Sequence, residues 1–138
     1  MFSVPLPLTL APPLSTLPSR NAEDIVLALE TGERWRADVR AAAAVKLEEH
    51  DGLQTLWLQG AQGEAAWQFS TNTVLRRVGR GPWVRLMANV KASTMQPDPR
   101  QRLTAWRWEL ELKPRAKASV KASRTRPLFT FLAVPQSP

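Results

Sequence analysis

The chain lacks cysteine and tyrosine altogether, and its only histidine is His50. Without cysteine it can form neither a disulfide framework nor a thiolate nucleophile. His50 adjoins Asp51-Gly52, a dipeptide typical of hairpin turns, and no spacing of Asp and Glu resembles a metal site. The Gly-Arg-Gly turn at 79–81 lacks the lysine–hydroxyl pair and the helix of a phosphate-binding loop. The sequence therefore predicts no enzymatic activity, no metal, no cofactor and no small-molecule substrate.

The first 20 residues also lack the features of a targeting segment. A secretory signal opens with basic residues and continues as an unbroken apolar helix, whereas the first basic residue here is Arg20. Prolines interrupt the segment at Pro5, Pro7, Pro12, Pro13 and Pro18, so neither a signal helix nor a membrane span is expected. The sequence predicts an extended, proline-rich arm over 1–20, either free or lying along a hydrophobic groove of the domain or of a partner. It predicts a cytoplasmic protein with no membrane partner.

The composition of the chain is that of an ordinary folded domain. It has 138 residues, of which 43% are hydrophobic and 22% are charged. This length matches the commonest size of one domain and is sufficient to bury a core. We therefore expect residues 21–138 to form a single β-rich domain with a basic loop at 115–126.

Alternating apolar and polar residues indicate β-strands from residue 24 onward. Asp24–Glu30 is a short, mostly apolar run that ends at a Thr-Gly turn signal. Within Trp35–Glu49, apolar residues occupy every second position. The alanine-rich part would favour a helix on propensity alone. Strict alternation nevertheless favours one long strand, or two strands with a bend near Ala42.

Short turns divide the remaining sequence into further strands. The turn signals are Asp51-Gly52, the Gly-rich segment 60–63, the segment 79–82 and the longer loop 97–99. The clearest strand is Leu103–Lys113, which alternates large apolar and charged side chains. The run from Leu128 to Val134 predicts a last strand that returns to the sheet. The expected fold class is all-β, an antiparallel meander that forms a small barrel or sandwich.

Positive charge is concentrated in the second half of the chain. Residues 1–75 contain five basic and nine acidic residues, a net charge of −4, and residues 76–138 contain fourteen basic and three acidic residues, a net charge of +11. The two values sum to the +7 of the whole chain. A biased genome composition explains many arginines better than it explains their segregation. The segregation predicts an anionic partner.

Single-stranded nucleic acid is the first partner that this charge pattern suggests. Lysine and arginine neutralise phosphates, and flat side chains stack on bases. Trp83 adjoins a turn and is the tryptophan expected to stack, while Trp35 is left unassigned. The core is expected to contain Trp57, Trp67, Trp106 and Trp108. The predicted nucleic-acid-binding residues are Arg76, Arg77, Arg80, Trp83, Arg85, Lys91, Arg107, Arg115, Lys117, Lys121, Arg124 and Arg126.

The alternative is a non-enzymatic assembly subunit that oligomerises through its ends. The leucine- and proline-rich arm at the start and the apolar stretch after residue 127 could each pack on a neighbouring copy. The acidic first half of one copy could also contact the basic second half of another. This hypothesis predicts a homo-oligomer that forms without nucleic acid.

Overall fold

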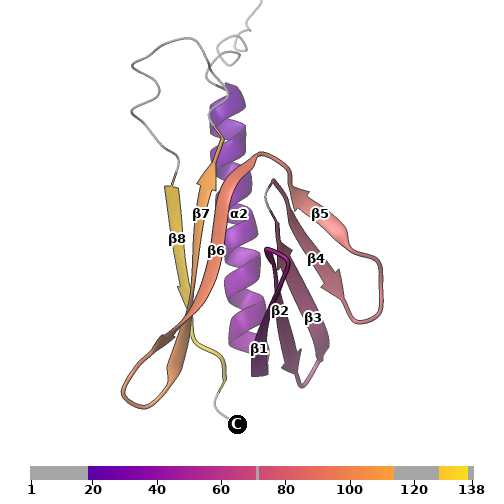
Figure 1. Cartoon of the computed structure of the whole chain (residues 1–138), viewed down its shortest axis with the longest axis vertical. Helices are drawn as coiled ribbons and strands as arrows, with labels where there is room; N and C mark the ends of the chain where they lie inside the picture. Colours follow the sequence, from indigo (N-terminus) through magenta and orange to yellow (C-terminus); the bar gives the residue numbers. More distant parts are fainter. Residues whose placement is uncertain (1–18, 71, 114–127, 137–138) are drawn as a thin grey trace, which may run out of the picture.

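The computed structural model describes residues 19–70, 72–113 and 128–136. It contains one long helix, α2 (Ser19–Ala41), followed by strands (Figure 1). The strands are β1 (Ala42–His50), β2 (Leu53–Gly60), β3 (Gly63–Phe69), β4 (Val74–Val78), β5 (Val84–Met87), β6 (Val90–Pro99), β7 (Thr104–Leu112) and β8 (Leu128–Ala133).

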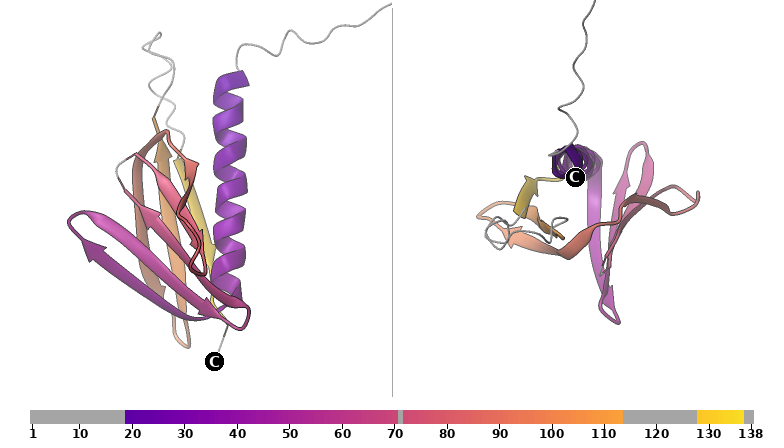
Figure 2. Two further views of the ribbon diagram at one scale, coloured as in Figure 1. Left: turned by 90° about the vertical axis from the view of Figure 1, so that its right-hand side faces the viewer. Right: turned by 90° about the horizontal axis from the view of Figure 1, so that it is seen from above.

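The strands form two antiparallel sheets in which sequence neighbours are also spatial neighbours. One sheet has the order β1-β2-β3-β4-β5 and the other has the order β6-β7-β8. The prediction of a mainly β fold built as an antiparallel meander is confirmed. The two sheets remain separate and do not close into a barrel, and α2 runs along the junction between them (Figure 2).

The helix is the main correction to the sequence-based prediction. Residues 24–30 and 35–41 were expected to be strands, and both belong to α2, which also includes Ser19 and Arg20 of the expected arm. The buried helix side chains Ala28, Trp35 and Val39 recur at helical spacing, whereas the alanines that continued the alternation, Ala37 and Ala41, are exposed. Small alanines on the solvent side of the helix therefore imitated a strand pattern. The strand begins at Ala42, where a bend was expected.

An aromatic cluster joins the helix to both sheets. Trp108 of β7 lies at its centre, with ring centroids 5.7 Å from Trp35 of α2 and 5.9 Å from Trp67 of β3. The Phe69 and Phe131 rings lie 5.0 Å and 5.3 Å from the same indole. Aromatic pairs at these separations add specific attraction to the burial of their surface. The Trp108 side chain therefore contacts the helix and residues of both sheets.

The helix approaches β8 so closely that only glycine fits at one position. A Cβ atom on Gly32 would lie 2.1 Å from Cε1 of Phe131, well inside van der Waals contact. Phe131 is itself buried and stacks parallel to Phe129 at 6.2 Å. At the far end of β8, the Gln136 N–H donates to the carbonyl oxygen of Ala42 at 2.9 Å. The last strand therefore packs against the helix at Phe131, and the residues that follow it are bonded to the start of β1.

Several predicted hairpins and strands are confirmed. Asp51 and Gly52 have φ values of 52° and 78° and connect β1 to β2, as expected of a tight hairpin turn. The strand expected over Leu103–Lys113 is β7, and its large apolar side chains are buried. The last apolar run forms β8, which pairs with β7.

Candidate functional surfaces

Arg76 was predicted to bind phosphate, but it is part of an internal network. Its Nε and Nη2 donate to the two carboxylate oxygens of Asp38 on α2, at 2.8 Å and 3.0 Å. The indole N–H of Trp67 donates to the same carboxylate at 2.8 Å. The side chains of Arg76 and Asp38 are only 22% and 15% exposed. Arg76 therefore fastens the helix to the five-stranded sheet through a carboxylate of the same chain.

Two other predicted cations, Lys91 on β6 and Arg107 on β7, lie on the three-stranded sheet. Lys91 Nζ is 3.5 Å from a carboxylate oxygen of Glu111, and Arg107 Nε is 4.0 Å from one of Glu109. The first pair joins β6 to β7, and the second lies within β7. The five predicted residues Arg115, Lys117, Lys121, Arg124 and Arg126 lie outside the described residues.

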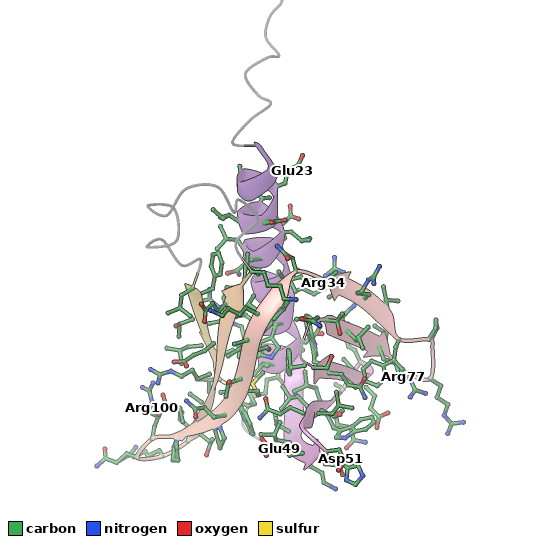
Figure 3. The ribbon with its side chains drawn as sticks, turned by 45° about the horizontal axis from the view of Figure 1, so that its top comes forward. Glu23, Arg34, Glu49, Asp51, Arg77 and Arg100 are labelled. Carbon is green, nitrogen blue, oxygen red and sulfur yellow. The ribbon has the colours of Figure 1, made fainter. Side chains whose placement is uncertain are left out.

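Four predicted residues do come together, on the hairpin between β4 and β5. We call this group the arginine hairpin, formed by Arg77, Arg80, Trp83 and Arg85. The Arg77 guanidinium lies over the Trp83 ring at 5.8 Å, and Arg80 and Arg85 are exposed. Figure 3 shows Arg77 at the outer edge of the five-stranded sheet, far from Arg100. Trp83 is partly exposed, and Arg77 lies over one face of its ring.

The sequence reasoning missed an aromatic residue on the outer face of this sheet. Trp57 was assigned to the core, yet it is only partly buried and aligns across the strands with Lys46 and, through Ala66, with Arg77. Its indole N–H donates to Glu48 at 3.0 Å. That hydrogen bond holds the pKa of Glu48 below its usual range, and a second hydrogen bond, from Lys46, acts in the same direction. Strict alternation with the buried Leu56 and Leu58 would have placed Trp57 outside.

The first half of α2 exposes a group of large apolar side chains. Ile25, Val26, Leu27 and Leu29 are 40%, 52%, 40% and 47% exposed, and we call them the apolar helix end. The buried face of the helix starts only at Ala28. Before it, Asp24 accepts a hydrogen bond from Nδ2 of Asn89 at 3.2 Å. The start of α2 extends past the sheets (Figure 2), whereas Leu27 lines a hollow together with residues 85–89. This surface was not predicted from the sequence, because the segment was expected to be a strand.

Comparisons with known proteins found nothing similar, so only the chemistry of the candidate surfaces bears on function. A scan against family models found no match, and searches of curated proteins and of solved structures returned no similar protein. Within 19–70, 72–113 and 128–136, no three His, Asp or Glu side chains are grouped as a metal site would need. Over the same ranges, no helix has the length and apolar character needed to cross a membrane.

Proposed function

We propose that the protein is a non-enzymatic assembly subunit that associates with other copies of itself through the apolar helix end. The observation that carries this proposal is the exposure of Ile25, Val26 and Leu29 on one side of the first half of α2. Contiguous apolar surface of this kind on a soluble domain marks an interaction site more often than scattered apolar residues do. The helix is held rigidly below this segment by Trp35 and Asp38. A rigid apolar segment loses little conformational entropy on association.

The proposed contact between copies is made by the first half of α2 and not by the extended arm that the sequence suggested. Residues 1–18 of the expected arm lie outside the described residues, whereas the first half of α2 is part of the described structure. The apolar helix end is preorganised, because the buried stripe from Ala28 to Val39 already fixes its direction. The helix then offers side chains at i, i+1 and i+4, namely Ile25, Val26 and Leu29, which suit a shallow apolar surface on the other copy.

The double substitution V26Q/L29Q is expected to weaken self-association at least about thirtyfold. Each buried aliphatic side chain contributes roughly 1.5–3 kcal/mol, and a loss of about 2 kcal/mol corresponds to that factor. Glutamine keeps the helix propensity high, so the fold should be retained. Sedimentation velocity over a concentration series measures the dissociation constant.

A matched control uses two exposed valines of the arginine hairpin region. Val78 and Val84 are 58% and 52% exposed, and V78Q/V84Q removes as much surface apolar character elsewhere. This control should associate like the wild type. If V26Q/L29Q also associates like the wild type, the apolar helix end is not the assembly surface and the proposal fails.

A second candidate function is the binding of single-stranded nucleic acid, and one observation favours it. The arginine hairpin brings three arginines and a tryptophan onto one β-hairpin, and Arg77 already stacks on Trp83. Arginine stacked on an aromatic ring presents a cationic surface to phosphates and a flat surface to bases. Three of the sequence-predicted residues do not support this function directly, because Arg76, Lys91 and Arg107 each have a carboxylate partner.

We expect R80E/R85E to reduce oligonucleotide binding if this second function is correct. Loss of two phosphate contacts should lower the slope of log affinity against log salt by about 1.4, since each contact to a single strand contributes about 0.7. Fluorescence anisotropy with a labelled oligonucleotide at several salt concentrations gives this slope. R34E, which reverses an exposed arginine on α2, serves as the control and should leave the slope nearer to that of the wild type. Absence of wild-type binding at low salt would contradict the hypothesis.

A further inference from the structure

A shallow apolar depression lies at the other end of the molecule from the apolar helix end. Two adjoining hollows of about 440 and 340 Å³ share Leu103 and Val134 in their walls. Leu132 of β8 completes the apolar part, and these three side chains are 45%, 41% and 40% exposed. We call this the basal hollow. An exposed apolar hollow of this size is large enough to receive two or three aliphatic side chains.

Arginines surround the basal hollow. Arg40, at the end of α2, and Arg100 line one part, and Arg102 lines the other. Arg100 pairs with Asp98 at 3.0 Å, and Arg40 and Arg102 are exposed. Among the described residues that line the two hollows, none is Asp or Glu. The hollow therefore combines an apolar wall, formed by Leu103, Leu132 and Val134, with a positive border, and this combination suits an apolar segment that carries acidic residues.

The apolar helix end has the complementary chemistry. Residues 22–30 contain Glu23, Asp24 and Glu30 and no lysine or arginine. Two such segments packed against each other would bring six carboxylates together, and like charges in one interface oppose association. Insertion into the basal hollow instead places the carboxylates near Arg40 and Arg102. Charge thus favours contact between unlike surfaces over contact between two helix ends.

The two surfaces cannot meet within one molecule. Ile25 and Arg40 lie on the same helix, 15 residues apart, which is about 22 Å at 1.5 Å per residue. Glu23 and Arg100 lie at opposite ends of the protein (Figure 3). We infer that the occupant of the basal hollow is the apolar helix end of a second copy. This inference rests on the proposed assembly function. A contact between different surfaces of two copies repeats along an open chain unless the rotation closes a ring.

Two variants, each blocked at one end, test this pairing. V26Q/L29Q leaves the basal hollow intact, and L103Q/L132Q leaves the apolar helix end intact. Each variant alone should be monomeric by sedimentation velocity at concentrations where the wild type associates. An equimolar mixture should form one-to-one pairs that grow no further. V78Q/V84Q mixed with either variant tests for non-specific effects, and thermal unfolding of every variant confirms that it is folded.

The outcomes separate this inference from the function on which it rests. If L103Q/L132Q self-associates like the wild type while V26Q/L29Q does not, the helix end packs elsewhere, and only the basal hollow is excluded. If both variants are monomeric and their mixture fails to pair, the hollow is likewise not the receptor of the helix end. If V26Q/L29Q associates like the wild type, or the wild type stays monomeric at high concentration, both proposals fail.

Wild-type association should also weaken severalfold between 50 and 500 mM salt, on the order expected for screened ion pairs.

Discussion

Replacing Asp38 by alanine is expected to lower the free energy of unfolding by about 3 kcal/mol, as for other ion pairs removed from largely buried sites. The substitution removes the acceptor of three hydrogen bonds, two from Arg76 and one from Trp67. It leaves a guanidinium only 22% exposed and a buried indole N–H without their partner. Urea denaturation followed by tryptophan fluorescence measures the change.

Glu33 offers a matched control for this experiment. It is an acid of the same helix, and its carboxylate lies 2.7 Å from Nη1 of Arg36, but its side chain is 62% exposed. E33A should change stability by less than about 1 kcal/mol, because exposed ion pairs contribute little. The double variant D38A/R76A should recover part of the loss, since it removes the unpaired cation as well. A loss for D38A no larger than that for E33A would contradict the assigned role of Asp38.

The strands were predictable because their local signals agree with their tertiary surroundings. From Trp106 to Leu112, β7 alternates buried residues with partly or fully exposed ones, and Asp51-Gly52 adopts the positive φ values that its dipeptide favours. The helix was missed because two periodicities coincide in its sequence. Trp35 and Val39 satisfy both an alternating and a helical pattern, and only burial shows that Ala37 between them faces solvent. Single-sequence periodicity cannot tell a small exposed alanine from a small buried one.

The candidate surfaces were less predictable than the fold, for a physical reason. The sequence shows how many arginines there are, but not which of them have a carboxylate nearby. Asp38 and Arg76 are 38 residues apart and meet only because α2 crosses the five-stranded sheet. The arginines of the β4–β5 hairpin are close in sequence, and a hairpin keeps such residues close in space, so their grouping was predictable. The basal hollow combines the end of α2 with the β6–β7 loop and the end of β8, which no local pattern connects.

The segregation of charge acquires a new interpretation from these placements. The acidic first half includes the residues around the apolar helix end, and the basic second half includes Arg100 and Arg102 beside the basal hollow. The anion that the second half suits could thus be the first half of another copy. This is the second of the two partners that the charge pattern allowed, and it requires no nucleic acid.

The substitution Q54L is expected to destabilise the protein by about 3 kcal/mol, because it leaves two backbone groups unpaired at roughly 1–3 kcal/mol each. The Gln54 side chain on β2 links the two sheets, because its amide group bonds to the backbone of Met95 on β6 as a neighbouring strand would. Its Oε1 accepts from the Met95 N–H at 2.9 Å, and its Nε2 donates to the Met95 carbonyl at 3.0 Å. Met95 is 1% exposed, so water cannot replace these bonds in the folded state.

Leucine has nearly the volume of glutamine, so the loss measured for Q54L reports hydrogen bonding more than packing. The control is Q68L, on the adjacent strand, where the amide makes a single long hydrogen bond of 3.5 Å to Thr55 Oγ1. Q68L should cost less than about 1 kcal/mol. Equal losses for the two variants would show that the sheets do not depend on the Gln54 bridge. A selective loss for Q54L, with faster exchange of the Met95 amide hydrogen, would show that this side chain joins the five-stranded sheet to the three-stranded sheet.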